Sequence, residues 1–144
     1  MKLRSINMEN YGIELIIDLH GCETTKFTRE GLTEYFRQLC ELIDMNREDL
    51  HFWDYEGYPE EKAAAPPHLV GISAIQFITT SNVTIHTLDI LKQAFINIFT
   101  CKDFSPELAV KFTEQYFKST QCRTTVIDRG KLGNGTNWHD MRKY

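Results

Sequence analysis

Three apolar runs follow one another too closely in the middle of the chain for a crossover helix to fit between them. They are rich in β-branched and aromatic side chains and cover residues 70–78, 82–86 and 94–100. Parallel neighbours need a crossover connection of about a dozen residues or more, whereas antiparallel neighbours need only a tight turn. The spacing therefore predicts a largely antiparallel sheet in this half of the chain.

Two helices are predicted outside these runs, each from a capping residue followed by an apolar stripe. Thr28 can cap a helix that starts at Arg29. Ser105 can cap a second helix, with Pro106 at its first position and Glu107 near the positive end of the helix dipole. The predicted core-facing stripes are Leu32, Tyr35, Phe36, Leu39 and Ile43 in the first helix, and Leu108, Phe112 and Tyr116 in the second.

Further strands are predicted at residues 13–19, 50–55 and 122–128, while the prolines of residues 57–67 exclude a central strand there. The resulting fold class is α+β: a two-layer sandwich with a largely antiparallel sheet and two helices on one face. The other face then needs a cover, which a second copy in a homodimer would supply. We expect one domain over residues 1–128 and a polar tail over residues 129–144.

Composition excludes several classes of function. A net charge of −4 disfavours nucleic acid as a partner, because phosphate binding needs a basic face. No apolar run reaches the roughly 18 residues of a membrane span, and the N-terminus lacks the apolar core of a signal peptide, so a cytoplasmic location is expected. The four cysteines show no CxxC spacing, so neither a disulfide framework nor a metal site is predicted.

A hydroxyl, an imidazole and a thiol occur in the predicted strands at spacings that allow them to meet. His86 follows Ser81 by five residues, Cys101 follows Ser81 by twenty, and Ser73 precedes it by eight. Taken singly, Ser81 would be an ordinary turn residue, His86 a core histidine and Cys101 a small buried side chain. On adjacent strands, however, these groups can converge on one point.

Four segments in this order resemble the small prokaryotic S-adenosylmethionine decarboxylases: residues 11–22, 71–73, 81–87 and 94–101. The resemblance implies a proenzyme that cleaves itself between Thr80 and Ser81 and converts Ser81 into a pyruvoyl cofactor. It also implies that His86 and Ser73 assist this processing and that Cys101 is the proton donor. The implied function is a self-processing, pyruvoyl-dependent decarboxylase of polyamine biosynthesis that acts on a small amine substrate.

The chain departs from the family pattern around the substrate. Thr80 stands where the family usually has Glu, and Leu88, Asp89 and Ile90 stand where it usually has Trp-Pro-Glu. Leu88 offers no ring to stack on adenine. Asp89 or Trp53 can replace the missing groups only if they reach the pocket. The substrate is therefore S-adenosylmethionine or a basic amino acid such as arginine or ornithine. The non-catalytic alternative is an uncleaved paralogue that acts as a partner or regulatory subunit.

Overall fold

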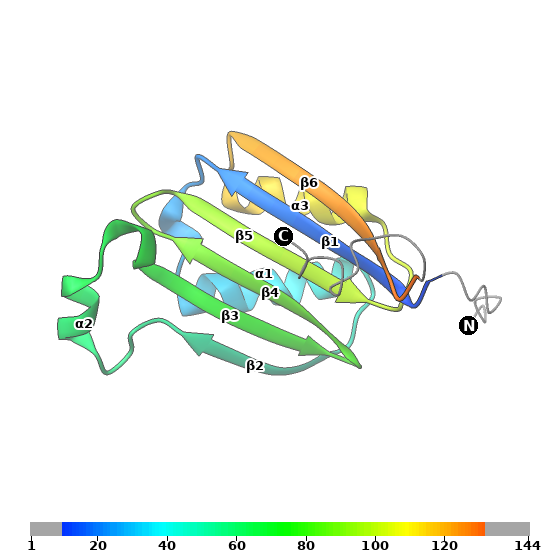
Figure 1. The fold of residues 1–144 in the computed structure, drawn as a ribbon, viewed down its shortest axis with the longest axis horizontal. Helices are drawn as coiled ribbons and strands as arrows, with labels where there is room; N and C mark the ends of the chain where they lie inside the picture. The colour runs from blue at the N-terminus through cyan, green and yellow to red at the C-terminus, as the bar shows by residue number, and fades with distance from the viewer. Residues whose placement is uncertain (1–9, 132–144) are drawn as a thin grey trace, which may run out of the picture.

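The protein was studied as a computed structural model, which describes residues 10–131. Within this range six strands form one sheet in the order β2-β3-β4-β5-β1-β6, and every neighbouring pair is antiparallel (Figure 1). The strands are β1 Gly12–His20, β2 Arg47–Trp53, β3 Gly71–Ile78, β4 Ser81–Leu88, β5 Gln93–Thr100 and β6 Gln121–Arg129. The long helices α1 (Arg29–Leu42) and α3 (Pro106–Phe117) lie on the same face of the sheet. The predicted α+β sandwich is confirmed.

Helix α1 begins where its cap predicts. The Thr28 side chain accepts a hydrogen bond from the backbone N–H of Gly31 at 2.9 Å. Gly31 is needed for close packing, since a Cβ there would lie 2.2 Å from the carbonyl oxygen of Lys26. All five predicted stripe residues are buried: Leu32, Tyr35, Phe36, Leu39 and Ile43.

Helix α3 also begins at its predicted cap, and of its predicted stripe Phe112 and Tyr116 pack against the core whereas Leu108 does not. Its fully buried residues are Ala109, Thr113 and Phe117, whereas the Leu108 side chain is 50% exposed. The prediction followed the largest apolar residues, but the tight contact with α1 selects a small residue and a hydroxyl. Thr113 Oγ1 lies 2.8 Å from the Tyr35 hydroxyl in the interface between the helices.

The region between β2 and β3 differs in detail from its prediction. β2 begins three residues earlier than the predicted strand, because the polar start of an edge strand gives no apolar signal. It ends at Trp53, shortly before Tyr55 takes a left-handed φ of 65°. No strand forms at residues 57–67, as the prolines predict, but a short helix does: α2, Pro59–Ala64.

The two faces of the sheet differ in cover. Residues such as Leu15, Ile96 and Val83 face α1 and α3 and form the core. On the opposite face, which we call the bare face, no helix or strand of residues 10–131 covers the sheet (Figure 1). One row of paired residues crosses this face from β2 to β6: Trp53, Ser73, His86, Phe95, Asp18 and Arg123.

The last described strand, β6, ends at Arg129, and the domain boundary after residue 128 stays a prediction. Most of the predicted tail, residues 132–144, lies outside the described residues. No helix of the described part of the chain has the length and apolar character needed to cross a membrane.

Candidate functional site

The turn between β3 and β4 holds the backbone in an unfavourable conformation. Ile78 pairs with Ser81, so Thr79 and Thr80 form a two-residue connection. Thr80 has a φ of 55°, in the left-handed region, where a β-branched residue is a true outlier. Such a conformation costs about 1–3 kcal/mol and persists only where the surroundings enforce it. The Thr80–Ser81 peptide bond therefore adjoins a strained residue.

Ser81, directly after this turn, has a hydroxyl that makes no hydrogen bond to the described residues. Its residue exposure is 7%, and its Oγ is buried without a hydrogen-bond partner. A buried polar atom without a partner costs about 1–3 kcal/mol, so such an atom requires an explanation. Its lone pairs are not engaged by any described donor. A serine that later becomes a cofactor fits this environment.

Cys101 lies at the same end of the sheet as Ser81. The last pair between β1 and β5 joins Ile13 to Thr100, so Cys101 follows directly beside Gly12. The side chain of the neighbouring Tyr11 lies near those of Cys101 and Thr80. The contact with Cys101 is the main reason that the pKa of Tyr11 is raised. Sequence reasoning missed Tyr11, because only the pairing of β1 with β5 brings it to this position.

Ser73 and His86 form a second cluster on the bare face. They are directly paired on β3 and β4, and Ser73 Oγ lies 2.8 Å from His86 Nδ1. This hydrogen bond fixes the orientation of the imidazole ring. Trp53 pairs with Ser73 on its other side, and its side chain is largely solvent-exposed, at 57% of the residue.

The two clusters do not meet within one chain. Five residues separate Ser81 from His86 along β4, which corresponds to roughly 17 Å at the rise of an antiparallel strand. Alternation also places Ser81 on the side of the buried Val83 and Ile85, whereas His86 lies on the bare face. The predicted convergence of the hydroxyl, the imidazole and the thiol is thus not reached by a single copy.

The three residues predicted to bind substrate, Leu88, Asp89 and Trp53, lie in different environments. Leu88 is 5% exposed, so its side chain is part of the packed sheet. Asp89 has one carboxylate oxygen buried without a hydrogen-bond partner among the described residues, and burial raises the pKa of Asp89. Trp53 is flanked by the rings of Tyr58 and Tyr55, with centroid distances of 5.6 and 6.3 Å. The exposed ring of Trp53 is therefore available to a ligand.

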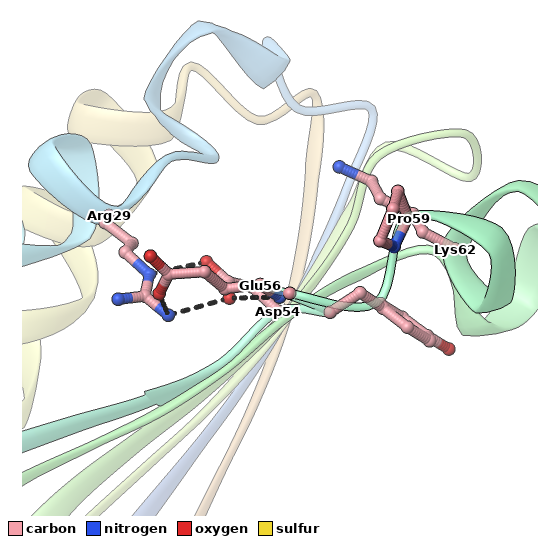
Figure 2. A pocket seen from close by; sticks show the side chains of 7 residues that line it. Arg29, Asp54, Glu56, Pro59 and Lys62 are labelled. Carbon is pink, nitrogen blue, oxygen red and sulfur yellow. Dashed lines mark hydrogen bonds and ion pairs between the residues drawn. The ribbon is translucent and has the colours of Figure 1, made fainter.

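A cavity of about 580 Å³ lies beside the N-terminus of α1 and the end of β2 (Figure 2). Arg29 is already paired there: it donates a hydrogen bond to Asp54 at 2.6 Å and also forms an ion pair with Glu56. The hydrogen bond from Arg29 lowers the pKa of Asp54. The cavity is lined by residues of α1, of the segment after β2 and of α2, and neither Ser73 nor His86 belongs to its lining.

Comparisons with known proteins show the family of this chain. The family model described as S-adenosylmethionine decarboxylase matches residues 13–130. A relative from Thermomicrobium roseum, an S-adenosylmethionine decarboxylase proenzyme, is 24% identical over 126 residues, which is 87% of this chain and 98% of the relative. An arginine decarboxylase proenzyme from Ignicoccus hospitalis is 27% identical over 89 residues, or 61% of this chain and 55% of that protein.

The fold has a counterpart among solved structures. The crystal structure of the adenosylmethionine decarboxylase from Aquifex aeolicus superposes with a TM-score of 0.68 at 18% identity, and covers 90% of this chain and 98% of that one. At this identity the likeness concerns the fold. Sheet, turn and family match together define a decarboxylase proenzyme fold. The chain belongs to the S-adenosylmethionine decarboxylase family, whose members are pyruvoyl-dependent carboxy-lyases.

Proposed function

We propose that this chain is the proenzyme of a pyruvoyl-dependent decarboxylase of polyamine biosynthesis and that it cleaves its own Thr80–Ser81 bond. One observation carries the proposal: a buried serine hydroxyl without a described partner follows a β-branched residue at a φ of 55°. Neither feature helps the fold. Both would assist a reaction at the bond between them.

The cleavage follows from the chemistry of the serine. The Ser81 hydroxyl attacks the carbonyl carbon of Thr80, and the acyl group moves from the Ser81 nitrogen to the Ser81 oxygen. β-Elimination then breaks the ester, which leaves a carboxylate on Thr80 and an unsaturated residue at position 81. This residue reacts with water, releases ammonia and becomes a pyruvoyl group. The keto group that results would supply an electron sink for the loss of CO2 from an amine substrate. A buried hydroxyl without a competing hydrogen bond suits the first step.

The remaining predicted residues have distinct roles in this proposal. Cys101, which lies at the same end of the sheet as the Thr80–Ser81 bond, can deliver a proton to the substrate after CO2 leaves. Ser73 and His86 form an oriented pair that can move protons during processing. Because Ser73 and His86 lie far from Ser81 in the same chain, the pair that acts on Ser81 must belong to another molecule.

A second copy is the source that we propose. The bare face carries exposed Trp53, Ile75 and Phe77 side chains, which a homodimer interface would bury. If two copies pack bare face against bare face around a two-fold axis, His86 of the partner subunit can approach the Thr79–Thr80 turn, and with it the backbone of the Thr80–Ser81 bond, from the side opposite to the Ser81 hydroxyl. Each dimer would then hold two sites, each built from both chains.

Co-expression of two inactive variants tests this arrangement. Ser81→Ala removes the cleavable serine from one chain, and His86→Ala removes the imidazole from the other. We expect the His86→Ala chain to remain intact alone and to be cleaved when it is paired with the Ser81→Ala chain. Normal cleavage of the His86→Ala chain alone, or no cleavage in the mixture, would contradict the shared site.

The substrate that we favour is S-adenosylmethionine. Trp53 presents an exposed ring beside the Ser73–His86 pair, with Tyr58 packed against it, and a planar base can stack on such a surface. The second candidate is a basic amino acid such as arginine or ornithine. It is supported by the absence of the family's Trp and Glu, and by the buried Asp89 oxygen without a described partner, which could accept a cationic group.

Two measurements test the proposed function. The intact mass of reduced, denatured protein should resolve into fragments 1–80 and 81–144, the second with a pyruvoyl group in place of serine. A single mass that persists after long incubation would favour the non-catalytic paralogue. Release of CO2 from S-adenosylmethionine, arginine and ornithine, assayed side by side, should be at least tenfold faster with one of them.

The cytoplasmic location stays a prediction.

A further inference from the structure

We propose that Glu48 is a positioning residue for self-cleavage, whose carboxylate holds the turn between β3 and β4 in its strained conformation through the side chain of Thr79. Its part in cleavage rests on the proposed function. The contact itself does not, because it is present in the uncleaved chain.

An irregularity in β2 brings Glu48 to this turn. Between two paired positions β2 contains one residue more than β3, so that Glu48 and Asp49 both stand opposite Phe77. An extra residue in one strand forms a β-bulge, which bends the strand and redirects its side chains. The bulge lies at the end of β2 that is next to the turn, where a redirected side chain can reach the turn.

A buried glutamine of β3 holds the bulge in place. Gln76 is 1% exposed, and its side-chain nitrogen donates hydrogen bonds to the backbone carbonyls of Glu48 at 2.9 Å and of Asp49 at 3.3 Å. Its side-chain oxygen is buried without a hydrogen-bond partner among residues 10–131, which costs the fold free energy. The hydrogen bonds from Gln76 fix the backbone of Glu48 beside the turn.

The turn is fastened to the start of β2 by two hydrogen bonds from Thr79. Its backbone N–H donates to the carbonyl of Asn46 at 3.0 Å, and its Oγ1 donates to Oε1 of Glu48 at 2.9 Å. The next residue, Thr80, has the left-handed φ of 55° and supplies the carbonyl of the proposed scissile bond. A strained conformation persists only where its surroundings enforce it. The bonds of Thr79 supply such a restraint directly beside Thr80.

Removal of the Glu48 carboxylate would loosen the turn without removing any part of the core. Glu48 is exposed, and the backbone carbonyl to which Gln76 donates is present whatever the side chain. A freed Thr79 side chain would let the turn relax at Thr80 before the Ser81 hydroxyl attacks. Cleavage would then lose the part of its rate that comes from strain.

Amide hydrogen exchange in a Ser81→Ala background tests the contact without any need for cleavage. The Thr79 N–H, which is bonded to the Asn46 carbonyl, reports how firmly the turn is held. Glu48→Ala should speed its exchange at least fivefold. Glu48→Gln should leave it within twofold, because the amide oxygen can still accept from Thr79. Asp49→Ala removes the neighbouring carboxylate of β2 and is the matched control, also expected within twofold. Unchanged exchange in Glu48→Ala would overturn the proposal.

The role in cleavage is measured with Ser81 restored, as the half-time of cleavage followed by intact mass. Glu48→Ala should lengthen the half-time at least threefold, whereas Glu48→Gln should stay within twofold of the parent. Thr79→Val removes the donor and should slow cleavage as much as Glu48→Ala does. The double variant should be no slower than either single variant, because both changes remove the same hydrogen bond. Cleavage of Glu48→Ala at the parental rate would rule out the positioning role.

A cycle with Thr80→Gly distinguishes positioning from a general loss of order. Glycine is not strained at a positive φ, so Glu48→Ala should slow cleavage less than twofold when it is added to Thr80→Gly. Equal slowing in both backgrounds would mean that Glu48 does not act through Thr80, and the proposal would be wrong. If the parent chain itself is never cleaved, the proposed function fails and the positioning role with it, while the exchange rates still decide the contact.

Discussion

The strain at Thr80 can be removed by a single substitution, Thr80→Gly, which should slow self-cleavage. A residue with a Cβ pays about 1–2 kcal/mol in the left-handed region, whereas glycine does not. If opening of the turn releases this energy on the way to the transition state, its loss slows cleavage by about 5- to 30-fold, since 1.36 kcal/mol corresponds to a factor of ten. Stability should change by less than about 1 kcal/mol, because the entropy of glycine opposes the gain.

The assay is the half-time of cleavage, followed by intact mass from the moment of purification. Thr80→Val is the first control, because it keeps the branched Cβ and the strain but lacks the hydroxyl. Lys92→Gly is the second control, since Lys92 has nearly the same φ of 54° in the turn between β4 and β5, away from Ser81. Cleavage by Thr80→Gly at the parental rate would refute the reasoning. A Thr80→Val variant as slow as Thr80→Gly would assign the effect to the hydroxyl instead.

Three other substitutions test the site and the fold. Cys101→Ala should lower turnover at least tenfold while some chain cleavage remains, as mass and CO2 release will show; equal loss of both would contradict its role as proton donor. Gly12→Ala should destabilise the fold by about 2–3 kcal/mol in urea unfolding, because its Cβ would overlap the Thr100 carbonyl oxygen. Arg29→Ala should cost about 1 kcal/mol or less at pH 7. Because Arg29 lowers the pKa of Asp54 in the folded state, this contribution is present above the unfolded pKa of Asp54, near 4, and is lost as the pH falls through the lower folded pKa; a stability difference between parent and variant that grows as the pH falls below 4 would contradict this origin.

Local sequence signals predicted most of the elements, because those signals act within a few residues. The caps at Thr28 and Ser105 set both helix starts, and the apolar runs set the central strands. The burial of α3 was predicted less well, since the choice of Ala109 and Thr113 over Leu108 depends on how closely α1 approaches. The start of β2 was missed because an exposed edge strand needs no apolar pattern.

The sequence by itself determined the chemical inventory of this protein: a serine, a histidine and a cysteine at family spacings, and the loss of the family's Trp and Glu beside them. The tertiary structure decided where these groups lie. Strand pairing brought the start of β1 beside Cys101, and the alternation of β4 put Ser81 and His86 on opposite sides of the sheet. Side-chain direction follows from strand parity and register, which only the assembled sheet fixes. The left-handed φ of Thr80 likewise depends on the pairing of β3 with β4, because no local preference of threonine favours it.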